Sequence, residues 1–82
     1  MKKIAIYSTP TCHFCHDVKE FFKANNLPYD EYDVQVDVAR REEMVQKTGK
    51  MAVPVISVTN EAGQEDVMVG FDEPKLRQLL GL

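Results

Sequence analysis

Both cysteines and both histidines of this 82-residue chain lie within five consecutive positions, in the order Cys12, His13, Cys15 and His16. Two thiols and two imidazoles in so short a stretch match three kinds of chemistry. They could form a zinc site, an attachment point for haem through Cys-x-x-Cys-His, or a redox-active pair of thiols. The spacing of the residues and the elements around them distinguish among the three.

A structural zinc site is disfavoured by the position of the ligands. Such sites take four ligands, usually as two pairs from separated positions, and this chain has no second Cys or His pair. On a helix, Cys12, Cys15 and His16 would share one side, whereas His13 would point elsewhere. We therefore expect no zinc within one protomer, while a cluster bridging two protomers stays open.

Haem attachment is disfavoured by the surroundings of the motif. A domain of this size needs the flanking segments for its own core, which leaves no room for a covalent haem. Attachment also takes place outside the cytosol, and the apolar stretch near the N-terminus, residues 4–7, is too short for an export signal. We interpret the match to Cys-x-x-Cys-His as a coincidence.

A dithiol explains why the motif lies between a predicted strand and a predicted helix. The first turn of a helix leaves N–H groups unpaired and carries the positive end of the helix dipole, and both stabilise a thiolate. Such sites lower the pKa of a cysteine from about 8.5 to roughly 3.5–7.5. We assign Cys12 as the nucleophile and Cys15, one turn deeper, as the resolving thiol. We expect His13 to face solvent; for His16, contact with the thiolate and a solvent-facing position stay open.

The hydrophobic pattern predicts four strands and three helices in the order β-α-β-α-β-β-α. The βαβ first half predicts parallel strands, and a hairpin then adds antiparallel ones. The result is an α/β fold, a mixed four-stranded sheet with helices on both faces. The strands are predicted at 3–8, 29–34, 53–58 and 66–69, and the helices at 12–25, at 39–48 and after position 72.

The helices are predicted from their apolar faces and their end signals. Gly49 is expected to stop the second helix, and Asp72 to cap the third, which carries Pro74 in its first turn. The side chains expected to face the core are Phe14, Val18, Phe21 and Phe22, then Met44 and Val45, and finally Leu76, Leu79 and Leu80.

The composition indicates one soluble domain, residues 1–82. A content of 44% hydrophobic and 28% charged residues argues against disorder. The net charge of −3 gives no reason to expect a nucleic acid or a membrane surface as partner. Two cysteines three positions apart close too small a loop to staple a domain, so we expect a cytoplasmic protein with a reactive pair.

The chain resembles the glutaredoxin family of the thioredoxin superfamily over nearly its whole length. The resemblance rests on STPTCHFC after the first strand, AVP at 52–54, and VGFDEPKL before the last helix. It implies a thioredoxin-like fold and thiol–disulfide exchange without a tightly bound cofactor. It also implies glutathione as reductant or co-substrate, disulfide-containing proteins as substrates, and a monomer.

The resemblance also implies a substrate surface around Cys12 and Cys15. In the family, the proline that matches Pro54 is cis and faces the dithiol, and the backbone at Val53 pairs with substrate like an added strand. The segment that matches Gly70 and Asp72 contacts the γ-glutamyl end of glutathione. The implied substrate-binding residues are Thr11, Phe14, Ala52, Val53, Pro54, Gly70, Phe71 and Asp72.

The chain departs from the family where cations are expected. Many glutaredoxins have Lys or Arg three residues before the first cysteine and Arg two residues before the position of Val53; here Thr9 and Met51 stand there. Lys50 and Gln46 are candidates to replace them in part. The motif itself reads Cys-His-Phe-Cys where the family commonly has Cys-Pro-Tyr-Cys.

Two alternatives to a glutathione-dependent enzyme stay open. The segment GFDEPKL is also similar to redoxins that serve ribonucleotide reductase and are reduced by thioredoxin reductase, although the Trp typical of that group is absent. From another class, Cys12 of two protomers and two external thiols would hold a 2Fe–2S cluster. The electron donor is therefore the main point that the sequence leaves undecided.

Overall fold

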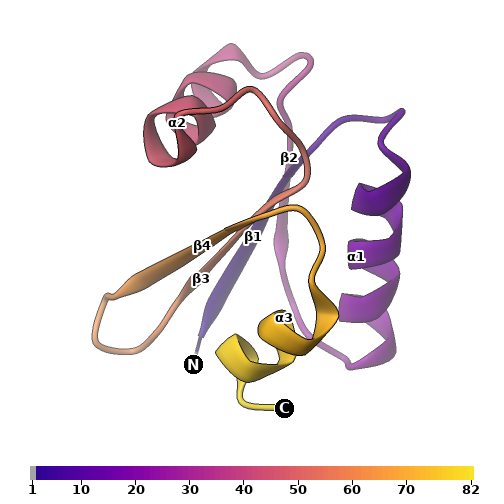
Figure 1. Ribbon diagram of the computed structural model, residues 1–82, viewed down its shortest axis with the longest axis vertical. Helices are drawn as coiled ribbons and strands as arrows, with labels where there is room; N and C mark the ends of the chain where they lie inside the picture. Colours follow the sequence, from indigo (N-terminus) through magenta and orange to yellow (C-terminus); the bar gives the residue numbers. More distant parts are fainter. Residues whose placement is uncertain (1) are drawn as a thin grey trace.

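The computed structural model, which describes residues 2–82, is built on a four-stranded sheet with the strand order β2-β1-β3-β4 (Figure 1). The parallel pair is β1 with β2, whereas β1 with β3 and β3 with β4 are antiparallel. The predicted element order and the mixed sheet are thus confirmed. The elements are β1 (Lys3–Ser8), α1 (His13–Ala24), β2 (Asp30–Asp33), α2 (Val38–Thr48), β3 (Val55–Thr59), β4 (Glu65–Val69) and α3 (Glu73–Leu80).

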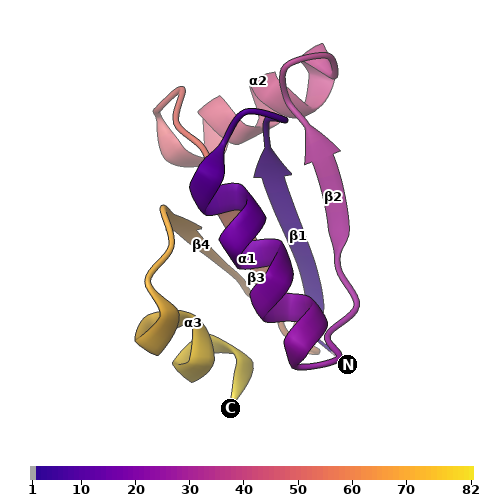
Figure 2. The same ribbon diagram turned by 90° about the vertical axis from the view of Figure 1, so that its right-hand side faces the viewer.

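The helices cover the two faces of the sheet unequally. Figures 1 and 2 show α1 and α3 on one face and α2 across one end of the other. Ile4 and Ile6 of β1 are buried in the cluster with α1 and α3, and Tyr7 is buried in a second cluster with Met44 of α2. Because β1 is covered on both faces, its carboxyl end holds the cysteine motif against a rigid support.

Several predicted boundaries were wrong by one or two residues. β3 begins at Val55 instead of Val53, because Pro54 has no backbone N–H to give to a ladder. β2 is shorter than predicted at both ends, and β4 begins one residue earlier, at Glu65. α2 begins at Val38, where the Asp37 side chain accepts a hydrogen bond from the N–H of Arg40.

One predicted core residue of α1 was wrong. The Phe14 side chain is 61% exposed, and Cys15 takes the inward position instead. The buried face runs through Cys15, Val18 and Phe22, at spacings of three and four residues, and Phe14 lies at the edge of that face in the first turn. The buried residues of α1 are Cys15, Val18, Phe21 and Phe22.

The stop of α2 at Gly49 and the cap of α3 at Asp72 were predicted correctly. Gly49 follows α2 with a φ of 71°, a left-handed conformation that favours glycine. The carboxylate of Asp72 accepts a hydrogen bond from the N–H of Lys75 at the start of α3. Met44 and Leu76 are the buried residues of the two helices, whereas Val45, Leu79 and Leu80 are only partly buried.

A network of ionised side chains ties α2 to the sheet. The Tyr7 hydroxyl donates to Glu43 at 2.6 Å, and Lys47 Nζ lies 3.3 Å from Glu43 and 2.6 Å from Glu65. The Ser57 hydroxyl also donates to Glu65. The hydrogen bond from Tyr7 lowers the pKa of Glu43, and the one from Lys47 lowers the pKa of Glu65. Both carboxyls therefore favour the ionised form in the folded protein.

This network predicts that acid will weaken the fold. A carboxyl whose pKa is lowered by folding stabilises the protein above its unfolded pKa, about 4.3, and loses that contribution as the pH falls through the folded value. We expect Glu65→Gln to reduce the free energy of unfolding at about pH 7. Between about pH 7 and about pH 3, the variant should lose less of this free energy than the wild type does. Urea unfolding at both pH values measures this.

Asp66→Asn is the matched control for this experiment, because Asp66 is exposed on the same strand and its side chain forms no hydrogen bond or ion pair within residues 2–82. It should behave like the wild type at both pH values. An equal loss of stability with acid in wild type and Glu65→Gln would contradict the assignment of the acid sensitivity to this network.

Candidate active site around the two cysteines

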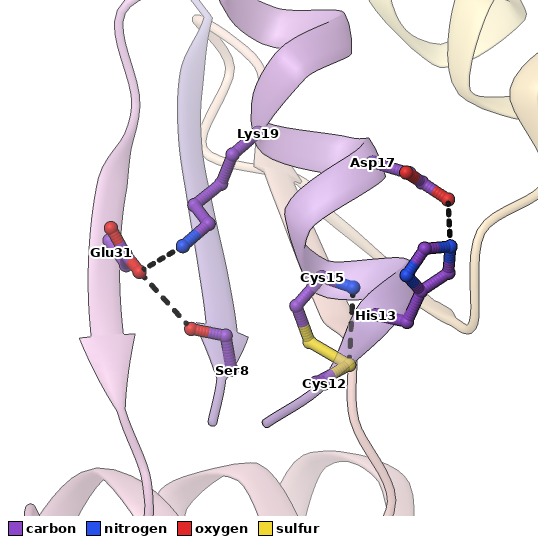
Figure 3. Close-up of a disulfide and its surroundings, with 7 residues drawn as sticks. All are labelled: Ser8, Cys12, His13, Cys15, Asp17, Lys19 and Glu31. Carbon is purple, nitrogen blue, oxygen red and sulfur yellow. Dashed lines mark hydrogen bonds and ion pairs between the residues drawn. A yellow bond between two sulfur atoms is a disulfide. The ribbon is translucent and has the colours of Figure 1, made fainter. Parts of the chain in front are cut away.

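Cys12 is the N-cap of α1, in the loop that follows β1. Its backbone is extended, with φ −82° and ψ 113°, and its Sγ accepts a hydrogen bond of 3.1 Å from the N–H of Cys15 (Figure 3). The two residues form a disulfide, with their Cα atoms 5.2 Å apart. An N–H of the first helical turn therefore points at the Cys12 sulfur, which is the geometry that stabilises negative charge at this atom.

The two sulfurs differ in their exposure. Cys15 is 1% exposed and packs in the apolar cluster beneath α1, whereas Cys12 is only partly buried at its margin. A disulfide approaching from solvent therefore meets Cys12 first. The roles predicted for the two thiols require such a difference.

Both histidines lie on the solvent side of α1. The ring of His13 is 3.7 Å from Asp17 (Figure 3), and the ring of His16 is 3.9 Å from Glu20. Their side chains are 82% and 65% exposed, so the predicted solvent-facing position of His13 is confirmed. The open question for His16 is decided in favour of solvent. Stabilisation of a Cys12 thiolate consequently rests on the helix N-terminus.

A second set of contacts fixes the start of α1 on the sheet. Glu31 of β2 accepts hydrogen bonds from Lys19 Nζ at 2.8 Å and from the buried Ser8 hydroxyl at 3.4 Å (Figure 3). Lys19 lies one turn after Cys15 on α1, and Ser8 is the last residue of β1. These bonds hold the dithiol at the carboxyl ends of the two parallel strands.

The loop before β3 presents free backbone next to the dithiol. The Val53–Pro54 peptide bond is cis, as the family resemblance implied. The Pro54 carbonyl accepts a hydrogen bond of 2.8 Å from Gly70, while Val53 forms no backbone hydrogen bond within residues 2–82. Val53 and Cys12 pack against the same apolar cluster. The donor and the acceptor of Val53 are thus available to an extended ligand.

Gly70 joins the two loops that the resemblance had singled out. Its φ of 87° lies in a region that other residues rarely adopt, which lets its N–H reach the Pro54 carbonyl. The next residue, Phe71, is partly buried, with its ring 6.0 Å from that of Phe21. Asp72 is exposed and caps α3. Phe71 therefore has a packing role that its assignment to the substrate surface did not include.

The remaining residues of the implied surface are distributed around Cys12. Thr11 and Phe14 are exposed on either side of it along the chain, and Ala52 is partly buried beside Val53. Their contact with substrate stays a prediction.

A groove beside Val53 contains a cation that the sequence analysis missed. It has a volume of about 250 Å³, and a neighbouring hollow of about 380 Å³ shares Arg41 and Met51 with it. Arg41 lies three residues before the buried Met44 on α2. This spacing is the sequence signal that would have placed Arg41 on the same side of the helix as Met44. The groove is lined by Thr9, Val34, Gln35, Arg41, Met44, Met51 and Val53, and the hollow adds Glu42, Val45 and Gln46.

Gln46 and Lys50, the two candidates to replace the missing cations, lie differently relative to the groove and the hollow. Gln46 lines the hollow next to Arg41, but Lys50 lines neither depression. Lys50 is exposed beyond the end of α2. Arg41 is therefore better placed than Lys50 to compensate for the neutral Thr9 and Met51.

The described part of the chain contains neither a grouped set of metal ligands nor a membrane-spanning helix. Within residues 2–82, no three His, Cys, Asp or Glu side chains are grouped as ligands of a single ion. A cluster shared by two protomers is a different arrangement and stays a prediction. No helix among these residues is long and apolar enough to cross a bilayer.

Comparison with known proteins adds sequence and structural relatives. A family model described as Glutaredoxin matches residues 4–62. An uncharacterized glutaredoxin-like 8.6 kDa protein from the rubredoxin operon of Clostridium pasteurianum is 35% identical over 77 residues, which is 94% of this chain and 96% of that protein. Glutaredoxin 3 of Escherichia coli K12 is 31% identical over 58 residues, covering 71% of this chain and 70% of the relative.

A solved structure is also similar to this chain. A point mutant of the thioredoxin-like protein BC3987 superposes with a TM-score of 0.79 at 40% identity, covering 99% of this chain and 97% of the other. The Clostridium protein and this solved structure each match more than nine tenths of the chain, whereas glutaredoxin 3 matches 71% of it.

Proposed function

The chain belongs to the glutaredoxin family, and from this premise we propose that it is a thiol–disulfide oxidoreductase that works through Cys12 and Cys15. Its fold is that of the thioredoxin-like protein BC3987. The observation that carries the proposal is the position of Cys12: a partly exposed N-cap whose sulfur accepts an N–H of the first turn, above a buried second cysteine.

The reaction consists of two exchanges. The Cys12 thiolate attacks one sulfur of a substrate disulfide, a bond forms between Cys12 and that sulfur, and the other sulfur leaves as a thiolate that takes a proton from solvent. Cys15 then loses its proton and attacks Cys12 Sγ, which forms the internal disulfide and releases the second substrate thiol. Two electrons have passed to the substrate, and no dissociable cofactor takes part.

The substrate is proposed to bind along the loop that contains Val53. Its backbone would pair with the free N–H and C=O of Val53 like an added strand, which brings its sulfur toward Cys12. Thr11, Phe14, Ala52 and Pro54 would contact this segment, and Gly70 to Asp72 would contact its other side. Disulfide-containing proteins and the mixed disulfide of glutathione are the substrates that fit such a surface.

The charges near the dithiol are expected to decide which electron donor works best. Glutathione carries two carboxylates, whereas the groove beside Val53 offers Arg41 and has the neutral Thr9 and Met51 at its sides. We therefore expect glutathione to work slowly and thioredoxin reductase to be an effective alternative. A dithiol of this kind is expected to act in the reducing cytosol.

A coupled assay tests both the activity and the donor. Oxidised protein and a protein disulfide are supplied with NADPH and either glutathione with its reductase or thioredoxin reductase. Oxidation of NADPH above the background without this protein is the expected result with at least one donor. Failure of both donors, together with failure of chemically reduced protein to cleave the disulfide, would overturn the proposed function.

Adding a cation to the groove should speed the reaction with glutathione. We expect Thr9→Lys and Met51→Arg each to raise the rate of glutathione mixed-disulfide reduction by about two- to tenfold, because each supplies a partner for a carboxylate. Thr9→Gln and Met51→Gln are the uncharged controls and should give no gain. Rapid wild-type activity that neither cation improves would show that other groups already bind both carboxylates.

A further inference from the structure

The two histidines have no part in the proposed exchange reaction, although both lie on the exposed side of α1 next to the dithiol. Each faces a carboxylate one turn later in the helix. His13 faces Asp17 (Figure 3), and His16 faces Glu20. Residues four positions apart on a helix are neighbours, and imidazole nitrogens and carboxylate oxygens are both ligands of zinc. The two pairs therefore carry a metal-binding chemistry that the exchange reaction leaves unused.

The separation of His13 and Asp17 suits a metal ion better than a hydrogen bond. Nε2 of His13 lies 3.7 Å from Oδ2 of Asp17, beyond the roughly 2.7–3.2 Å of an N–H···O hydrogen bond. Two ligand atoms at about 2.0–2.1 Å from a tetrahedral zinc are roughly 3.3–3.4 Å apart. The two side chains are 82% and 42% exposed, so a small rotation of either brings the pair to this spacing.

The neighbouring pair, His16 and Glu20, is less suited to a cation. Oε1 of Glu20 lies 3.9 Å from the ring of His16 and 3.8 Å from Nζ of Lys23. The charge of this lysine would repel a zinc ion placed at Glu20. Asp17, in contrast, has no lysine or arginine partner within residues 2–82. The pair formed by His13 and Asp17 is therefore the one open to a metal.

One molecule supplies only half of a zinc site. Zinc takes four ligands, and within residues 2–82 no third His, Cys, Asp or Glu side chain joins His13 and Asp17. A second copy related by a twofold axis would add the same two ligands. The ion would also neutralise the two Asp17 carboxylates. Without it, two chains of net charge −3 would repel each other.

An exposed apolar ring lies beside the pair. The Phe14 side chain is 61% exposed, and its ring centroid lies 6.0 Å from that of His13. Burial of this ring against a second copy would remove apolar surface from water and stabilise the contact. Because His13 directly follows Cys12 in the chain, the contact would lie beside the site of exchange.

We propose that two copies of this chain share one zinc ion, which each copy binds through Nε2 of His13 and Oδ2 of Asp17. No thiol takes part, so the dimer forms with the disulfide between Cys12 and Cys15 intact. The site is independent of the proposed exchange reaction. It also differs from a cluster held by Cys12 of two protomers, because its ligands are nitrogen and oxygen atoms.

The test uses oxidised protein, whose cysteines are closed in the disulfide and cannot bind a metal. Zinc chloride is titrated into the protein in a calorimeter, and light scattering after gel filtration measures the mass with and without zinc. We expect one zinc per two chains and a doubling of the 9.4 kDa mass, reversed by EDTA. Cobalt(II) in place of zinc should give the intense visible absorption of a tetrahedral site with nitrogen and oxygen ligands.

Variants assign the ligands. His13→Gln and Asp17→Asn should each lower the zinc affinity by more than about 100-fold and leave the protein monomeric. Loss of a direct ligand should exceed the roughly 10–100-fold that changes to groups around a ligand cost. His16→Gln and Glu20→Gln are the matched controls on the same side of α1 and should dimerise like the wild type. All four side chains are exposed, so circular dichroism should show an unchanged fold.

The outcomes separate this inference from the proposed function. A protein that binds no zinc, or binds cobalt(II) only with the weak absorption of an octahedral surface ion, would overturn the inference and leave the exchange reaction unaffected. Binding of one zinc per chain without a doubling of the mass would also overturn it. Loss of the dimer in His16→Gln or Glu20→Gln, but not in His13→Gln, would show that the ligands are assigned wrongly.

Discussion

Replacing Cys12 with serine is expected to reduce disulfide exchange to the uncatalysed background, because no other exposed thiol remains to attack a substrate. The reason lies in the N-cap geometry. The N–H of Cys15 donates to Cys12 Sγ at 3.1 Å, and the helix dipole adds positive potential at the same atom. A serine hydroxyl in this position forms no disulfide, so both halves of the reaction are lost.

Alkylation of the reduced wild type by iodoacetamide at a series of pH values measures the activation of Cys12. The midpoint should lie well below the free-cysteine value of about 8.5. His16→Gln is the control, because the ring of His16 points to Glu20, and this variant should leave the midpoint unchanged. A midpoint at or above about 8.5, or exchange that survives in Cys12→Ser, would remove the basis for calling Cys12 the nucleophile.

Replacing Cys15 with serine is expected to stop the reaction after its first half. Cys12 would still attack, but the mixed disulfide with glutathione or a protein would persist, because the thiol that releases it is gone. Mass spectrometry of the protein after incubation with oxidised glutathione should find one glutathione bound, on Cys12. Turnover of a protein disulfide should fail. Turnover at the wild-type rate would show that the dithiol mechanism is wrong for this protein.

The burial of Cys15 requires a second variant in this experiment. Its side chain is 1% exposed, and a serine hydroxyl left without a partner there would cost about 1–3 kcal/mol of stability. Cys15→Ala avoids the buried hydroxyl and should trap the same mixed disulfide. Agreement between the two variants separates the loss of the thiol from a disturbance of the fold.

The parts of the structure predicted correctly depend on neighbours in the sequence. Gly49 ends α2 and Asp72 caps α3 because such signals act within one helical turn. The single wrong core residue of α1, Phe14, was predicted because it is apolar and lies four residues before Val18, but Cys15 takes the inward position of that turn. The cis peptide before Pro54 was implied by the family resemblance alone.

The groove at Arg41 shows what the sequence did not reveal. Its walls come from the loop after β1, the end of β2, helix α2 and the loop before β3, and these segments meet only in the folded chain. The same holds for the bond between Gly70 and Pro54, which joins residues from two separate loops. Helical periodicity placed Met44 correctly in the core. It does not predict which segments of the folded chain lie opposite Arg41.

The strand order has a consequence for how molecules of this protein behave toward one another. The outermost strands, β2 and β4, each leave one row of peptide groups without a neighbouring strand, and such rows are templates for pairing between molecules. Both strands carry acidic side chains that form no ion pair within residues 2–82, namely Asp30 and Asp33 on β2 and Asp66 on β4. Two molecules that approach along these rows would bring like charges face to face. The chain can therefore offer the free backbone of Val53 to a substrate while its acidic margins discourage open-ended polymerisation through the sheet.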